Sequence, residues 1–253
     1  MIFSRKHKLL YIKGRKVAST SIEISLSKIC DSEDIITPLT PADEKLRLSL
    51  DYKHAQNYGA DNDELENYIN QLRQTSIANL KELKPPKGSY RNHLSLNQIS
   101  QKLGDEIKDI RIIAVTRSPY QYICSLLNFQ AQRKLYQAGQ KKMQMPQREL
   151  KKLIPRLIES IENQSLKRNY DLYKVPERLE SQINVHTIRF ENISTALNTY
   201  LESQDIPRVD LPHAKKGGGF EDKFILEIVT PLQLSKINDY FSEEFRDFNY
   251  PKL

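Results

Sequence analysis

The segment at residues 9–26 constrains the fold more than any other part of the chain. It begins with a short apolar run at 9–12, which suits a buried strand, and it returns apolar residues at helical spacing over 22–29. Small, hydroxyl-bearing and basic residues fill the loop between them. A loop that leads from a buried strand into a helix directs several backbone N–H groups and the positive end of the helix dipole at one point. The sequence therefore predicts an anion-binding site at this loop.

The loop departs from the phosphate-binding pattern G-x-x-x-x-G-K-[ST] in an informative way. Gly14 matches the first glycine and Ser21 the final hydroxyl, whereas Ser19 and Thr20 replace the second glycine and the lysine. A nucleoside triphosphate site needs that lysine, so ordinary ATP or GTP hydrolysis is disfavoured. A single phosphate with Lys16 as a nearby cation fits better. The alternative is a turn whose Ser and Thr residues only cap the helix.

The composition is that of a soluble protein of one domain. The chain has 253 residues, of which 38% are hydrophobic and 28% charged. Strands alternate with helices along it, and we therefore expect one α/β domain over residues 1–253, with a central, mainly parallel sheet flanked by helices. The net charge of +7 favours anionic ligands but is too small to indicate a nucleic-acid partner.

The sequence also bears on compartment and metal binding. No apolar stretch has the length of a membrane span, and a strand is expected within nine residues of the start, which leaves no room for a cleavable signal. We expect a cytoplasmic protein. Cys30 and Cys124 each lie in an apolar helical pattern and are predicted to be reduced core thiols. The histidines lack ligand spacing, so no metal site is expected.

A second strand-to-helix junction follows the strand predicted at residues 111–116. Arg117 stands at the end of this strand, and Ser125 lies eight residues on, within the helix predicted over 120–133. Ligands of open α/β sheets bind at the carboxyl ends of strands. Two such junctions with phosphate-type ligands are more informative than either alone.

His93 is the candidate general base. It falls just before a short helix that Ser95 and Gln98 are predicted to open with a capping box. A helix N-terminus lowers the pKa of an imidazole and keeps it neutral, as a general base requires. The alternative is a hydrogen-bonded structural histidine, and His54 is the second choice for the base.

The remaining expectations concern the connecting segments. Residues 31–45 and 49–63 are predicted to be loops, and 64–84 to be a helix that ends before two prolines. A helix from Pro146 is expected to be bent or interrupted by Pro155. A strand at 184–190 precedes a helix at 191–203, and a last helix starts at Thr230 and includes Phe245.

These motifs together resemble the sulfotransferases that use 3′-phosphoadenosine 5′-phosphosulfate (PAPS). Residues 16–21 resemble the 5′-phosphosulfate loop of that family, and Arg117, followed by Ser125, resembles its 3′-phosphate element. The segment 90–99 is similar to one in membrane-type and bacterial members, and a weaker match runs through 188–192 to 248–250. The chain departs from the family at Arg15, where many members have Pro, and it contains no Trp to clamp an adenine.

The resemblance implies a fold, a reaction and a set of residues. The fold is a P-loop-like single domain, and the reaction is sulfuryl transfer from PAPS to a hydroxyl or amine, without a metal. Lys16 would neutralise charge on the bridging oxygen, and His93 would take the proton of the acceptor. The implied ligands of the 5′-phosphate are Arg15, Lys16, Val17, Ala18, Ser19, Thr20 and Ser21. Those of the 3′-phosphate are Arg117 and Ser125. Residues 213–220, in which two lysines precede three glycines, resemble the segment that covers this phosphate in cytosolic members and would add Lys215 and Lys216; a flexible surface loop is the alternative.

The acceptor is the least constrained part of the prediction. It is a small molecule or a glycan, and a run of basic residues over 133–152 would suit an anionic one such as an acidic polysaccharide. A solvated helix face explains the same run. Two other classes stay open: a P-loop nucleotide kinase or phosphotransferase, and a non-catalytic relative that only binds anions.

Overall fold

The chain divides into two units, both discontinuous in sequence. Unit 1 comprises Met1–Val115 and Asp171–Lys215, and unit 2 comprises Thr116–Tyr170 and Lys216–Leu253. The computed structural model describes residues 1–137, 145–212 and 219–253. Each unit has a hydrophobic core of its own, and the two are described separately.

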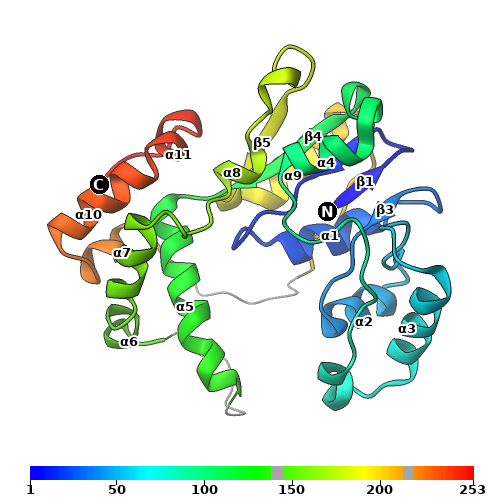
Figure 1. Cartoon of the computed structure of the whole chain (residues 1–253), viewed down its shortest axis with the longest axis horizontal. Helices are drawn as coiled ribbons and strands as arrows, with labels where there is room; N and C mark the ends of the chain where they lie inside the picture. The colour runs from blue at the N-terminus through cyan, green and yellow to red at the C-terminus, as the bar shows by residue number, and fades with distance from the viewer. Residues whose placement is uncertain (138–144, 213–218) are drawn as a thin grey trace. The chain divides into compact units, whose positions relative to one another are not determined.

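Unit 1 is built on a mixed five-stranded sheet in the order β3-β1-β2-β4-β5 (Figure 1). The strands are β1 (Ile2–Ser4), β2 (Leu9–Tyr11), β3 (Ile35–Ile36), β4 (Arg111–Thr116) and β5 (Val185–Arg189). β1 is antiparallel to β2 and β3, whereas β2 and β4 are parallel. The fold is α/β as predicted, but the expectation of a mainly parallel sheet is wrong. β1 and β3 have three and two residues, which is too short for an alternating pattern to reveal them.

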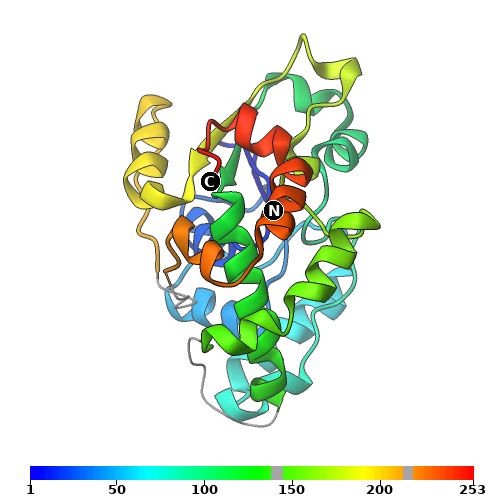
Figure 2. The same cartoon turned by 90° about the vertical axis from the view of Figure 1, so that its left-hand side faces the viewer.

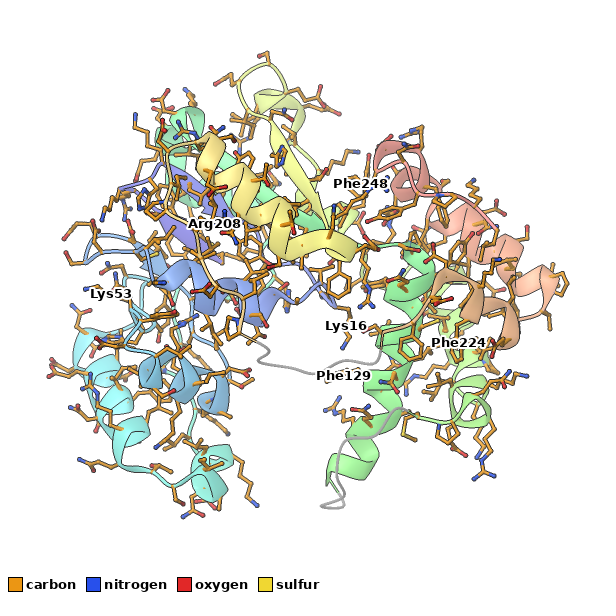
Figure 3. The ribbon with its side chains drawn as sticks, turned by 180° about the vertical axis from the view of Figure 1, so that it is seen from behind. Lys16, Lys53, Phe129, Arg208, Phe224 and Phe248 are labelled. Carbon is orange, nitrogen blue, oxygen red and sulfur yellow. The ribbon has the colours of Figure 1, made fainter. Side chains whose placement is uncertain are left out.

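Helices cover both faces of this sheet. α1 (Ser19–Ser27) and α9 (Ile193–Ser203) pack against β2 and β4 on one face, in a core that includes Leu9, Tyr11, Ile22, Leu26, Ile113, Val115, Leu197 and Leu201. α4 (Leu96–Leu103) lies on the other face, as the opposite views of Figures 1 and 3 show. α2 (Pro41–Ser49) packs against α3 (Asn62–Gln74) and the 3₁₀ turn Ile77–Glu82.

Unit 2 is helical. It contains α5 (Pro119–Gln137), α6 (Gln147–Lys151), α7 (Ile154–Glu162), α10 (Pro231–Tyr240) and α11 (Ser242–Asp247). α7 packs beside α10, and the 3₁₀ turn Asp222–Glu227 packs beside α5 (Figure 2). Aromatic side chains fill much of the core, including Tyr120, Phe220, Phe241 and Phe245. The four-residue helix α8 (Tyr170–Tyr173) carries the chain back to unit 1.

Several predicted elements are confirmed. The strand at 111–116 is β4, and the strand and helix expected at 184–203 are β5 and α9. Ser95 and Gln98 form both bonds of the capping box that opens α4, and Thr230 does the same with Gln233 at α10. Cys30 and Cys124 are buried free thiols.

Other predictions were wrong in ways that have a physical reason. Residues 31–45, expected as a loop, contain β3 and most of α2. The sequence pattern did not predict α2 because its buried side chains are charged rather than apolar. Glu44 and Arg47 form a fully buried ion pair at 3.0 Å. By contrast, the expected interruption at Pro155 is confirmed: α6 ends at Lys151, and Pro155 lies in the first turn of the next helix, α7, where proline's fixed φ is favourable. The helix expected over 64–84 ends at Gln74, and the last helix is divided into α10 and α11.

Among the helices that the structure describes, none combines the length and apolar character needed to cross a membrane.

Candidate functional site

The loop between β2 and α1 has a strained backbone. Lys16 has a φ of 60° and Ala18 a φ of 55°, both in the left-handed region, and the buried Val17 lies between them. Each non-glycine residue in that region costs roughly 1–2 kcal/mol. Such conformations persist where the surrounding structure enforces them, and they cluster at ligand sites. The strained backbone therefore makes this loop a candidate ligand site. Lys16, which lies in the loop, is labelled in Figure 3.

The start of α1 is suited to an anion. The N-cap residue is Ala18, whose methyl group cannot accept a hydrogen bond from the first turn. The Ser19 hydroxyl is turned back into the loop, where it donates to the Gly14 carbonyl at 2.6 Å. Backbone N–H groups at a helix start point out along the helix axis and, together with the dipole, attract anions.

The Tyr173 hydroxyl packs closely against Gly14, in the loop. This hydroxyl donates to the carbonyl of Val115, in β4, at 2.9 Å. A Cβ atom added at Gly14 would overlap this hydroxyl and would also crowd Val17. Gly14 is thus required by the close approach of Tyr173, a contact that the sequence did not predict.

A buried ionic cluster lies behind the loop. The Lys13 ammonium pairs with the carboxylate of Glu23, on α1, and the amine of Met1 pairs with the same carboxylate. Burial alone would raise the pKa of Glu23, but the charges of Lys13, Met1 and Arg47 outweigh it and lower that pKa to about 2. Glu23 is therefore ionised in the folded protein.

His93 is held against the first residue of the loop. Its Nδ1 atom lies 3.0 Å from the carbonyl oxygen of Lys13 and, because a carbonyl only accepts, Nδ1 carries the proton. Burial, helped by the charges of Arg15 and Lys13, lowers the pKa of His93 to about 4, although the bond to the carbonyl opposes this. The imidazole is neutral at pH 7, with its lone pair on Nε2. The low pKa was expected from a helix N-terminus, whereas burial is its main cause.

Of the predicted 3′-phosphate ligands, Arg117 and Ser125 belong to unit 2. Arg117 is 9% exposed, follows β4 directly, and donates from Nε to Gln121 at 3.4 Å. It lines a hollow with Thr116, Pro119, Tyr122, Asn169, Phe241, Glu244 and Phe248. Ser125 is half-buried on α5, about two turns further along. Lys215 and Lys216 lie outside the described residues.

Unit 1 therefore places His93 against Lys13, the residue before Gly14, and close enough to Arg15 for the charge of Arg15 to lower the pKa of His93. The second choice for the base, His54, instead hydrogen-bonds the carbonyl of Ala55 at 2.8 Å. Lys13, Glu23 and Tyr173 were missed by the sequence reasoning. The only signal for Glu23 was a carboxylate between two isoleucines in an otherwise uncharged helix.

The basic run over 133–152 is described only in part. Lys141 and Lys142 are outside the described residues, as is the side chain of Lys134. Near α6, Lys152 and Arg148 both pair with Glu149, at 2.9 and 3.5 Å, and both are exposed. This part of the run is a solvated, locally paired helix face.

Comparisons of the chain with protein-family models, with curated proteins and with solved structures found no match.

Proposed function

We propose that this chain is a PAPS-dependent sulfotransferase that moves a sulfuryl group to a hydroxyl or amine acceptor. The observation that carries the proposal is the hydrogen bond between His93 and the Lys13 carbonyl, because it holds a neutral imidazole at the start of the strained loop. Transfer from a phosphate-bearing donor needs a base and a set of fixed anion ligands in one place.

The loop would bind the 5′-phosphate mainly through its backbone. The side chain of Val17 is buried in the core and Ala18 has no polar side-chain atom, so both contribute N–H groups alone. Arg15 and Lys16 add positive charge, and Ser19 to Ser21 form the first turn of α1. The ammonium of Lys16 would neutralise the bridging oxygen as the bond to sulfur breaks.

His93 would act as the general base through Nε2. The acceptor's proton moves to Nε2 while the acceptor atom forms a bond to sulfur, and the bond between sulfur and the bridging oxygen breaks. The leaving group is adenosine 3′,5′-bisphosphate. A base with a pKa of about 4 stays unprotonated throughout the neutral range.

Arg117 and Ser125, with Lys215 and Lys216, are proposed for the 3′-phosphate. This assignment is supported by the resemblance of Arg117 and Ser125 to the family's 3′-phosphate element. It is also supported by the place of Arg117 directly after β4, because ligands of α/β sheets bind outside the carboxyl ends of strands. The acceptor class proposed is a small molecule or a glycan, including an anionic one.

A thermal-shift screen tests the proposal against the two other classes. Adenosine 3′,5′-bisphosphate should raise the Tm of the wild-type protein, since a ligand at 100 times its Kd adds about 2.7 kcal/mol. Stabilisation by ATP with magnesium alone would indicate a phosphotransferase. Stabilisation by polyanions alone, lost at high salt, would indicate a non-catalytic anion-binding protein. The double variant Lys16→Ala, Arg117→Ala should abolish the shift caused by the bisphosphate.

A further inference from the structure

Glu23 is a fully buried charge to which the proposed chemistry gives no role. Its side chain is 0% exposed on α1, and it pairs with the Lys13 ammonium and the Met1 amine. Removing a carboxylate from water is costly, and an apolar side chain of similar size would pack there without that cost. The contacts of the Glu23 carboxylate therefore indicate which groups it holds in place.

Two sets of contacts lead from Glu23 to His93. In the first, Lys13 binds Glu23 through its ammonium and His93 through its carbonyl. In the second, the Thr37 hydroxyl lies 3.2 Å from Glu23 Oε1 and 3.4 Å from Asn92 Oδ1. Because its one proton serves only one of these oxygens or the Met1 carbonyl at 3.0 Å, this second set is a packing contact rather than a continuous chain of hydrogen bonds. Asn92 precedes His93 and is itself tied to the Pro38 carbonyl at 3.0 Å.

His93 needs such support because its backbone is strained. Its φ is 62°, in the left-handed region that side chains with a Cβ atom rarely adopt. A strained residue keeps its conformation only when surrounding contacts impose it. The contacts that run through Lys13 and Asn92 supply this constraint on either side of the imidazole.

We infer that Glu23 is a positioning residue: its carboxylate fixes Lys13 and, through the Lys13 carbonyl, holds the His93 imidazole with its lone pair on Nε2. The inference rests on the proposed function in one respect, namely that His93 acts as the base. The geometric part, that Glu23 sets the state of His93, stands independently of any activity.

The test is the ionisation and tautomer of His93 in Glu23→Gln, measured by NMR of its ring carbon and nitrogen atoms. Loss of positioning exposes the ring, so the pKa should rise from about 4 toward the ordinary 6.5 and both tautomers should appear. A purely electrostatic role predicts the opposite, since the Glu23 charge itself raises the pKa of His93. An Nδ1–H tautomer with an unchanged or lower pKa would overturn the inference.

Glu44→Gln is the matched control. Glu44 is equally buried and pairs with Arg47 rather than Lys13, so its loss removes a buried ion pair without touching the His93 contacts. The pKa and tautomer of His93 should stay at their wild-type values. An equal change in both variants would show that loosening of unit 1 is the cause, and would overturn the inference.

Lys13→Met with Glu23→Leu covers the case in which Glu23→Gln does not fold. The double variant removes the Lys13 and Glu23 charges together and leaves the buried Met1 amine with the Thr37 hydroxyl as its partner. It should fold, and His93 should still show both tautomers. A folded double variant with the wild-type His93 tautomer would overturn the inference.

Activity supplies a separate measurement. If the wild type transfers sulfuryl groups, Glu23→Gln should lower kcat about tenfold or more, with a smaller change in the KM for PAPS. A loss of kcat with an unaltered His93 spectrum would overturn the inference. If the wild type has no such activity, the proposed function fails, while the NMR result still decides the role of Glu23.

Discussion

The Nδ1 atom of His93 lies 3.0 Å from the carbonyl oxygen of Lys13, a residue 80 positions earlier in the chain. Lys13 is therefore bound at both ends, because its ammonium pairs with Glu23 inside the core. The bond also selects the His93 tautomer, since only a protonated Nδ1 can donate to a carbonyl. The His93 imidazole and the start of the strained loop are thus parts of one local structure.

The first prediction concerns the base. His93→Gln should lower kcat by about 10²–10⁴-fold, the usual contribution of a positioned general base. The wild-type rate should fall as pH drops toward about 4, where His93 becomes protonated, and this acidic limb should vanish in the variant. His186→Gln is the control, because the proposed chemistry gives His186 no role and its ring stacks on Tyr200, on α9. An acidic limb that survives in His93→Gln would move the base to another residue, with His54 the next to test.

The second prediction concerns stability against pH. The pKa of His93 is about 4 in the folded protein and near 6.5 in the unfolded chain, so the unfolded state binds more protons between these values. The contribution of the shifted His93 pKa to the free energy of unfolding is fully present above pH 6.5 and is lost as the pH falls toward 4. Urea unfolding of the wild type should show the free energy of unfolding decreasing across this window. The decrease should be smaller in His93→Gln, and equal slopes in the two proteins would contradict the shifted pKa.

The third prediction concerns Lys16. Lys16→Ala should lower kcat by about 10²–10³-fold, which corresponds to about 2.7–4 kcal/mol of lost transition-state stabilisation. Alanine keeps a Cβ atom, so the backbone strain at φ 60° is the same and only the cation is removed. Lys53→Ala, at an exposed lysine of unit 1, should leave turnover unchanged. Full turnover in Lys16→Ala would show that the cation has no part in the transfer step.

The fourth prediction concerns Arg117. Arg117→Ala should weaken the binding of adenosine 3′,5′-bisphosphate by about 1.5–3 kcal/mol, or roughly 10–150-fold in Kd, because a charge-assisted contact to a phosphate is lost. Isothermal titration calorimetry measures this directly. Arg148→Ala serves as the control, since the Arg148 side chain is 83% exposed. An unaltered Kd in Arg117→Ala would remove Arg117 from the nucleotide site.

The sequence predicted those parts of the fold that have long, regular patterns. β4 contains four consecutive buried apolar residues, Ile112 to Val115, and the capping boxes at Ser95 and Thr230 are local hydrogen-bond patterns that tertiary structure did not override. β1 and β3 were missed because strands this short contain no period, and α2 because charges occupy its buried face.

The candidate site was predicted only in its local part. The loop at residues 14–21 could be read from one continuous segment, and His93 from its place before a helix. The contacts that hold the loop and His93 could not be predicted from the sequence. Lys13, Glu23 and Tyr173 reach their partners only through the tertiary structure. The left-handed φ of Lys16 and Ala18 also could not be predicted, since neither lysine nor alanine favours that conformation.

The last prediction tests the packing of Tyr173 on Gly14. Gly14→Ala should lower the free energy of unfolding by about 1–3 kcal/mol, because the added methyl group overlaps the Tyr173 hydroxyl. Tyr173→Phe alone should cost about 1 kcal/mol through the lost bond to the Val115 carbonyl. In the double variant the hydroxyl that clashes is absent, so the combined loss should be smaller than the sum of the two. Urea unfolding of the four proteins gives this coupling as a double-mutant cycle. Strictly additive losses would mean that Gly14 is required by Val17 or by the loop backbone rather than by Tyr173.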